Sequence, residues 1–525
     1  MQVYTAEKIF TGQGAPKTNW AFGVEYGKIR WCGPRRDAPK SENPTIDLGK
    51  LVTPGLIDAH IHPLLLADNL GALACIPPKI TSIPRLIAQL RQQAATTEGW
   101  ILGWGWDESL LDEGRAPTRA ELDEVSRDRP IYLERSDCHS GLANSAALAM
   151  AGIGRTTLNP PDGEIVRDGA GEPTGYLREH GANQMVKGII SRPSPAEKAR
   201  TLGQLGRVMG EYGLTCVAEM MARSNEGDPH ALYQDAVRHG WAQESHLYYV
   251  SDAIPADYIF PTEQMRGHIR VSGVKLFLDG ALSNETAFLH SKYCGSHAQS
   301  GSNGMALCSP SQMRKAEQIA RGNGIQLAVH AMGDGAIEAL LDNWEDAKPW
   351  CEAVPAVRIE HASMLRPDLI ARLARAKMEF AVATNMDFFF AEYNSYSTLL
   401  DGEQFANCYR VADMYRAVPA LALTSDAPAT PWAEAFSPFV SIYAAVARRA
   451  AGGEDLGQDQ AITVSQALEL YTSRAAKILP TAQGWIKPGA PACFTALDRD
   501  IFTCSHVEIL GTRALATYIN GENVL

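Results

Sequence analysis

Two histidines lie one residue apart, His60 and His62, in the stretch GLIDAHIHPL (55–64). Side chains at positions i and i+2 of a β-strand point to the same face, whereas on a helix they diverge by roughly 200°. The preceding stretch is apolar and interrupted by Pro54 and Gly55, which predicts a short buried strand. Two imidazoles on one face suit a transition metal, and the alternative is a pair of core histidines satisfied by hydrogen bonds.

Seven further apolar segments follow along the chain, and each ends in polar or acidic residues. They span 213–220, 245–252, 271–280, 325–334, 357–365, 378–387 and 420–428. The gaps between them hold helical stretches such as 309–324, where Ser309 or Ser311 can begin a helix and Gly322 or Gly324 can end it. Strands that alternate with helices predict a parallel sheet. Eight such units predict an α/β fold, a (β/α)8 barrel of the TIM type.

Four more residues able to bind a metal stand at the ends of these segments: Lys275, His330, His361 and Asp426. Active sites of such barrels lie at the carboxyl ends of the strands, so we expect all six residues to face one mouth. Each also has a purely structural interpretation, as a surface lysine, a core histidine or an aspartate that caps a helix. Because all six stand at strand ends, a metal centre is the favoured interpretation.

Seven motifs resemble the amidohydrolase superfamily, and within it the metal-dependent hydrolases that include the N-substituted formamide deformylases. Five of them occur in order at the predicted strands: PGLIDAHIHPL, GVKLFLDGALSNETAFL, LAVHAMGDGAIEALLD, RIEHASML and LTSDAP. Two more lie between the first and second strands: DCHSGLANSAAL and DGEIVRDGAGEPTGYLRE. The resemblance covers nearly the whole chain.

The resemblance implies a metal-dependent hydrolase with a deformed barrel and a β-sandwich made from both chain ends. It implies one or two divalent ions, and zinc is expected because imidazole-rich sites suit it. The implied ligands are His60 and His62 for one ion, His330 and His361 for a second, and Asp426 as a ligand that also handles protons.

Lys275 is the unusual member of this set, since a dication repels an ammonium group. The resemblance implies that carbon dioxide converts this lysine to a carbamate, an anion able to bridge two ions. The alternation of VSGVKLFLDG, which places Lys275 on the face opposite Val274 and Leu276, allows this modification.

Divalent ions lower the pKa of bound water toward neutrality and polarise a carbonyl group. Asp426 can take the proton of the resulting hydroxide and later pass it to a leaving amine, which supports hydrolysis of a C–N bond. His139, in the motif DCHSGLANS, is a second catalytic candidate that could contact the substrate carbonyl; a structural role beside Asp137 and Asn144 is the alternative. Members of that family often carry a basic segment after the lysine that corresponds to Lys275. This chain instead has Asn284 and Glu285 there, which we take as substrate-binding candidates.

The remaining sequence predicts how the chain is divided. Residues 66–204 are too long for one connection and form a predicted inserted subdomain near the barrel mouth, with the barrel in 51–65 and 205–480. Residues 1–50 and 481–525 carry strand-and-turn patterns with little helical period, so we expect them to pair as one β-domain.

Composition and charge exclude several classes of function. The 525 residues are 45% hydrophobic and 21% charged, as in ordinary globular proteins. A net charge of -12 argues against a nucleic-acid or anionic-membrane partner, because a polyanion would be repelled. The first residues lack a continuous apolar signal region, and ten scattered cysteines without a C-x-x-C pair indicate buried apolar residues rather than disulfides. We therefore expect a soluble cytoplasmic protein, with monomer and homo-oligomer both left open.

Three functions compete at this stage. The favoured one is hydrolysis of an amide bond in a small molecule. The second is deamination of a ring or hydrolysis of a cyclic amide, which would use the same metals. The third is a non-catalytic binding or assembly protein on this scaffold, which would normally have lost metal ligands, whereas all six candidate positions are intact here.

Overall fold

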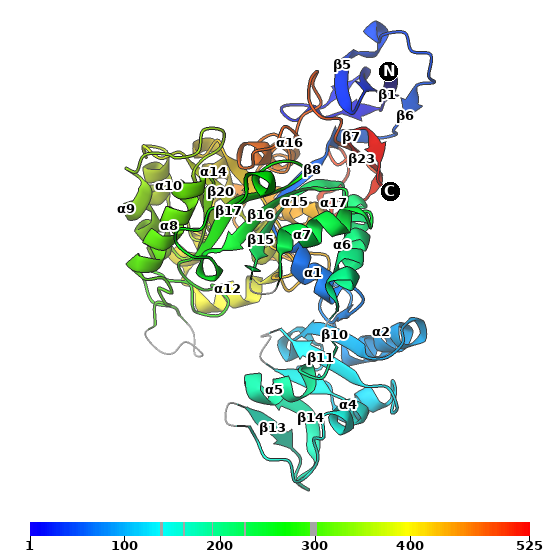
Figure 1. Ribbon diagram of the computed structural model, residues 1–525, viewed down its shortest axis with the longest axis vertical. Helices are drawn as coiled ribbons and strands as arrows, with labels where there is room; N and C mark the ends of the chain where they lie inside the picture. Colours follow the sequence, from blue (N-terminus) through cyan, green and yellow to red (C-terminus); the bar gives the residue numbers. More distant parts are fainter. Residues whose placement is uncertain (137–139, 161–162, 192, 225–226, 295–301) are drawn as a thin grey trace. The chain divides into compact units, whose positions relative to one another are not determined.

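The computed structural model describes residues 1–525 except 137–139, 161–162, 192, 225–226 and 295–301 (Figure 1). The described chain divides into two compact units. The larger contains Met1–Leu64, Lys198–Thr430 and Ala435–Leu525, and the smaller contains Leu65–Glu197 and Pro431–Glu434. Among the described residues, no helix is both long and apolar enough to cross a bilayer.

Eight parallel strands form the centre of the larger unit, which confirms the predicted α/β barrel. In chain order they are β8 (Leu56–Ile61), β15 (Leu214–Ala222), β16 (Glu244–Val250), β17 (Ile269–Phe277), β18 (Gln326–Ala331), β19 (Val357–His361), β20 (Phe380–Thr384) and β21 (Leu421–Leu423). Each strand pairs in parallel with the next one along the chain. The segments that end the first and last strands are joined by two backbone hydrogen bonds, from Asp426 N–H to His60 O (2.8 Å) and from His62 N–H to Ala427 O (2.9 Å). The carboxyl ends of the strands therefore meet at one mouth.

Helices fill the connections between the barrel strands, and the last three described α-helices follow β21. They include α1 (Pro63–Asn69), α6 (Pro195–Gly210), α7 (Pro229–Val237), α8 (Pro310–Asn323), α9 (Asp334–Trp344), α10 (Pro367–Leu373), α11 (Met386–Ala391), α12 (Tyr393–Leu399), α13 (Gly402–Ala406), α14 (Val411–Ala417), α15 (Pro438–Ala447), α16 (Val464–Glu469) and α17 (His506–Ile509). Helix α8 begins and ends where two of the predicted signals stand: the Ser309 side chain accepts a hydrogen bond from the Gln312 backbone in a capping box, and Gly324 ends the helix at φ 63°.

Both chain ends contribute to one β-rich region of the larger unit, as predicted. One sheet has the order β5-β4-β1-β6 and the other β24-β23-β22-β7-β2-β3. Their strands are β1 (Gln2–Thr5), β2 (Lys8–Ile9), β3 (Lys17–Thr18), β4 (Trp20–Glu25), β5 (Lys28–Pro34), β6 (Ile46–Asp47), β7 (Leu51–Pro54), β22 (Phe494–Leu497), β23 (Ala514–Ile519) and β24 (Glu522–Asn523). Aromatic rings join the two ends, since Phe494 lies 5.1 Å from Tyr4 and 4.8 Å from Phe22 between ring centroids. Burial of this shared aromatic core holds the two termini in one domain.

The smaller unit has its own sheet and its own apolar core. The sheet order is β13-β14-β12-β11-β10-β9, from β9 (Leu73–Ala74), β10 (Ile101–Trp106), β11 (Ile131–Arg135), β12 (Gly141–Ala143), β13 (Glu164–Arg167) and β14 (Pro173–Arg178). Its helices are α2 (Ile83–Thr96), α3 (Arg119–Asp123), α4 (Ser145–Met150) and α5 (Glu179–Lys187). Leu86 and Leu90 of α2 pack in one buried cluster with Ile101 and Ile131 of the sheet. That this segment covers the barrel mouth stays a prediction.

Candidate metal centre

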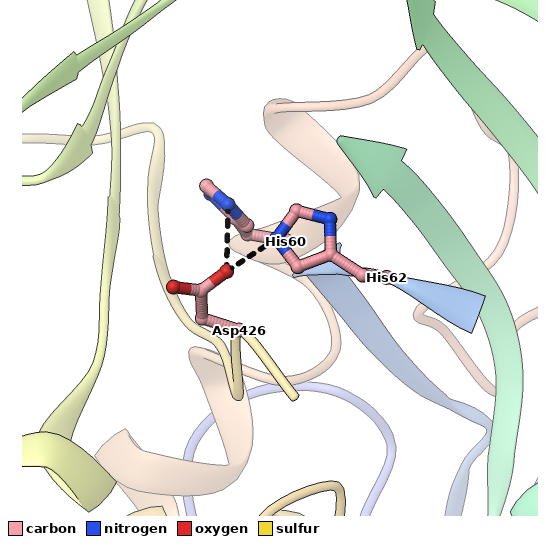
Figure 2. Close-up of side chains that lie close together, drawn as sticks. All are labelled: His60, His62 and Asp426. Carbon is pink, nitrogen blue, oxygen red and sulfur yellow. Dashed lines mark hydrogen bonds and ion pairs between the residues drawn. The ribbon is translucent and has the colours of Figure 1, made fainter. Parts of the chain in front are cut away.

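One group of side chains that could hold a metal ion is His60, His62 and Asp426 (Figure 2). His60 is the fifth residue of β8, and His62 follows the strand directly. Asp426 Oδ1 lies 2.7 Å from His62 Nε2 and 3.1 Å from His60 Nε2. All three side chains are buried. The predicted pair of same-face imidazoles thus meets a carboxylate from the last strand of the barrel.

The backbone holds Asp426 in an uncommon conformation. Its φ is 51°, in the left-handed region that a residue with a Cβ seldom adopts. The backbone hydrogen bond from Asp426 N–H to His60 O (2.8 Å) compensates part of the cost of roughly 1–3 kcal/mol. Backbone strain of this kind persists where the surrounding structure holds the residue in place. Here the strained turn directs the Asp426 carboxylate to the two histidines.

The other three predicted residues lie around this group. The ring centroid of His361 is 4.8 Å from that of His60 and 4.4 Å from that of His330. The Nζ of Lys275 is 3.5 Å from His60 Nε2. His361 ends β19 with a φ of 72°, in the left-handed region, so the backbone turns at the residue that carries the ring. All six side chains predicted from the sequence therefore converge at the carboxyl ends of five strands.

Each imidazole also has one ring nitrogen next to a protein acceptor. His60 Nδ1 is 2.6 Å from Glu360 Oε2, His330 Nε2 is 3.0 Å from Gly280 O, and His361 Nδ1 is 3.0 Å from Asn385 Oδ1. His62 Nδ1 has a looser neighbour, Glu219 Oε1 at 3.6 Å. At His60, His330 and His361 these contacts assign the N–H to the contacting nitrogen, which is how proteins orient metal-binding histidines.

A buried ion pair supports His60 from inside the barrel. Arg358 donates to Glu360 through Nε (2.8 Å) and through a second nitrogen (3.0 Å), and neither side chain is exposed to solvent. Arg358 also donates to the Tyr248 hydroxyl (2.8 Å) and to the Ala59 carbonyl (2.7 Å). Reasoning from the sequence missed both charged residues. The signal was present in RIEH, where two charges interrupt an otherwise apolar strand beside a predicted ligand.

The protonation states at the centre suit a cation in most respects. Burial lowers the pKa of His330 to about 3, with a further contribution from the Lys275 charge, and burial also lowers the pKa of His361. Burial opposes ionisation of Asp426, but His60 and His62 hold its pKa well below the usual range. For His62 burial likewise favours the neutral form, and hydrogen bonds to Asp426 and Glu219 outweigh it and raise the pKa to about 9. A cation must therefore compete with the proton on His62.

These residues fit a divalent ion. Four imidazoles and one carboxylate are the donor types that zinc and similar ions prefer. His60, His62, His361 and Asp426 are buried and His330 is partly buried, so water has little access to compete for these ligand atoms. His60, His62, His330, His361 and Asp426 would hold the ion or ions.

A second group, Cys216, Glu244 and His246, also brings possible ligand atoms together. Its carboxylate is already paired with Arg270 and accepts hydrogen bonds from Thr481 (2.8 Å) and Gln483 (2.7 Å). Burial raises the pKa of the Cys216 thiol well above its usual value, which opposes the thiolate that a metal requires. This group is therefore an ion-pair network that stabilises the barrel.

The other predicted site residues are not part of this group of side chains or lie outside the described chain. His139 lies outside the described residues. Asn284 is exposed and Glu285 is partly exposed, in the loop that follows β17. That loop is fixed at its base, where Asp279 accepts backbone hydrogen bonds from Phe288 (3.0 Å), Met332 (3.0 Å) and Gly333 (2.8 Å). A substrate-binding role for Asn284 and Glu285 stays a prediction.

Comparison with known proteins agrees with the metal-binding geometry of this centre. Residues 45–525 match the sequence pattern of the amidohydrolase family. The chain is 28% identical over 516 residues to the N-substituted formamide deformylase of Arthrobacter pascens, covering 95% of this chain and 93% of the relative.

Two crystal structures share the fold. An uncharacterized metal-dependent hydrolase from Pyrococcus horikoshii OT3 superimposes with a TM-score of 0.72 at 25% identity, over 96% of this chain and 99% of that chain. A second one, from Pyrococcus furiosus, gives 0.70 at 23% identity, over 96% and 100%. The resemblance found in the motifs is confirmed: the chain belongs to the amidohydrolase family and is a metal-dependent hydrolase acting on carbon–nitrogen bonds other than peptide bonds.

Proposed function

We propose that the protein hydrolyses an amide-type C–N bond in a small molecule and that Asp426 moves the proton. The observation that carries this proposal is the contact of one carboxylate oxygen, Asp426 Oδ1, with Nε2 of both His60 and His62 (Figure 2). This oxygen lies among the nitrogens that would ligate the ion, where the attacking water and the substrate carbonyl must meet. Its low pKa keeps the carboxylate ionised, so its oxygens are free of a proton before the reaction begins.

When bound, a divalent ion would polarise the substrate carbonyl and lower the pKa of water. Asp426 accepts a proton from the attacking water as the water oxygen bonds to the carbonyl carbon. The same carboxyl then donates this proton to the amide nitrogen as the C–N bond breaks, so the leaving group departs as a neutral amine. His361, fixed through Nδ1 by Asn385, and His330, fixed through Nε2 by Gly280, keep their rings oriented throughout.

We also propose that Lys275 is carboxylated. Burial lowers the pKa of Lys275 to about 8, although Glu360 and Asp426 oppose this, so a fraction of the amine is neutral near neutral pH. A neutral amine can attack carbon dioxide: the N–C bond forms, a C=O electron pair moves to oxygen, and the displaced proton leaves to solvent. The resulting carbamate would place a negative charge beside His60. Two bound metal ions would need such a charge to offset their mutual repulsion.

Four further assignments complete the proposal. Zinc is the proposed ion because imidazoles dominate the donor set. His139 is a proposed contact of the substrate carbonyl, with Asn284 and Glu285 near the substrate. The cytoplasm is the proposed compartment, because the nine cysteines of the described chain are all free. Nucleic acid is not a proposed partner, given the net charge of -12.

A screen of metal-loaded protein tests the function. N-formyl amines, N-acyl amines, cyclic amides and aminated rings should be compared, since the Arthrobacter relative is named for N-substituted formamides. We expect release of an amine from an open-chain amide, and loss of that activity when the metal is removed by chelation and its return on adding zinc. Activity that is indifferent to chelation, or confined to ring deamination, would contradict the proposal.

A further inference from the structure

Two segments meet across the mouth of the barrel. One is the loop after β17 and the other is the helical segment α11–α13 after β20. Between these strands the sheet order places β18 and β19, which carry His330 and His361. The Ser283 hydroxyl donates to Glu392 Oε1 (3.1 Å), and the Gln404 side chain donates to the Lys292 carbonyl (3.1 Å). Since the two segments come from opposite sides of β18 and β19 and touch each other, their contact lies beyond the ends of those strands.

Glu392 stands at the junction of α11 and α12, within this contact. It has the Ser283 hydroxyl as a hydrogen-bond donor, but no lysine, arginine or histidine of the described chain forms an ion pair with it. Burial raises the pKa of Glu392 to about 7; hydrogen bonds from Ser283 and Tyr396 oppose the shift, and the Asp426 charge adds to it. Glu392 is thus a partly buried acid with no ion-pair partner among the described residues.

Two aromatic residues lie one turn before and one turn after this acid on its own segment. Phe388 stacks on the His361 ring at 6.0 Å between centroids and an interplanar angle of 11°. Tyr396, one turn after Glu392, is fully buried. An aromatic ring beside the histidines, on the same segment as a carboxylate with no cation partner in the described chain, matches an aliphatic or aromatic amine, because the ring can cover the carbon skeleton and the carboxylate can pair with the charged nitrogen.

We propose that Glu392, held by Ser283, binds a protonated amino group of the substrate, so that the preferred substrates are amides carrying a second, cationic nitrogen. This rests on the proposed function, and it assigns that site a substrate class. The carboxylate holds the cationic end of the substrate and leaves the amide carbonyl to face Asp426 and the histidines. Ser283 acts as a positioning residue that fixes one carboxylate oxygen.

Matched substrates provide the test. Metal-loaded protein at pH 8 should be given an N-acylated diamine and an N-acyl alkylamine of equal chain length, which differ only in the terminal charge. We expect kcat/KM to favour the charged compound about tenfold or more, because each tenfold corresponds to about 1.4 kcal/mol and a desolvated ion pair supplies at least that. Glu392→Gln should reduce kcat/KM for the charged substrate by about 10–100-fold and change the neutral one by less than about threefold.

Two further variants and one binding measurement complete the design. Ser283→Ala should give a smaller loss with the charged substrate only, and the exposed Glu403→Gln on α13 should leave both substrates unchanged. Binding of the free diamine to metal-loaded protein, measured by calorimetry, should weaken at least tenfold in Glu392→Gln. This binding needs no turnover, so it decides the inference even if no amide is hydrolysed and the proposed function fails. Equal preference for the two substrates, or equal diamine affinity in Glu392→Gln and wild type, overturns it.

Discussion

Glu360→Gln tests whether the buried ion pair behind His60 serves the metal centre. Glu360 accepts two hydrogen bonds from Arg358, at 2.8 and 3.0 Å, and contacts His60 Nδ1 at 2.6 Å. A glutamine keeps the volume but removes the charge, and its NH₂ group must face either a guanidinium or an imidazole N–H. Removing one partner of a buried pair costs about 3–5 kcal/mol, because the other charge stays in a site without water.

The same variant should weaken metal binding. Loss of a carboxylate that orients a metal-binding histidine typically lowers affinity by about 10–100-fold, and His60 would lose both its anionic acceptor and its fixed tautomer. Urea unfolding of the metal-free protein measures the first effect, and competition with a chromogenic chelator measures the second. Glu338→Gln is a matched control: its side chain is 33% exposed in an ion pair with His290, so it should cost no more than about 1 kcal/mol.

A double variant separates the two effects. Arg358→Met with Glu360→Gln removes the unpaired cation, so much of the lost stability should return, as when buried ion pairs are replaced by apolar side chains. Metal affinity should stay low, since His60 still lacks a charged acceptor. A single Glu360→Gln variant with stability within about 0.5 kcal/mol of wild type and unchanged metal affinity would refute the reasoning.

Three further predictions concern the proton, the lysine and the pH. Asp426→Asn should keep the fold and most of the metal but lose about 10²–10⁴-fold in kcat, the range for a general acid–base group, whereas near wild-type turnover would assign the proton to another residue. Lys275→Ala should lower metal content measured by elemental analysis, and bicarbonate should speed reconstitution of the wild type only; a free amine beside a fully occupied two-metal site in a high-resolution crystal structure would contradict the carbamate. Glu244 has a pKa of about 2, below its usual 4.5, because His246 and Arg270 outweigh the effect of burial. Because its folded-state pKa is depressed, the stability that Glu244 contributes is present above pH 4.5 and is lost as the pH falls toward 2. The difference in unfolding free energy between wild type and Glu244→Gln should therefore shrink over that range. A constant difference would argue against the ion pair.

Local sequence patterns determined the eight barrel strands and the six candidate ligands. Short apolar runs between helical stretches predict parallel strands, and parallel strands place all their carboxyl ends at one mouth. For this reason His60, His330 and His361 could be expected to meet although their partners in space are distant in the chain. Local sequence also predicted the ends of α8, because Ser309 and Gly324 form hydrogen bonds with backbone groups within four residues of themselves.

The tertiary structure alone decided which groups complete the site. Glu360 contacts His60 across 300 residues, and Asp426 contacts His62 across 364. Ser283 reaches Glu392 across 109 residues. No periodicity encodes such pairs, since they depend on strand twist, on the left-handed turns at His361 and Asp426, and on which loops touch above the barrel. Sequence therefore determined where metal-binding side chains collect. The folded barrel decided which acceptor orients each histidine and which acid has no cation partner in the described chain, because desolvation and hydrogen bonding act only once distant segments are packed together.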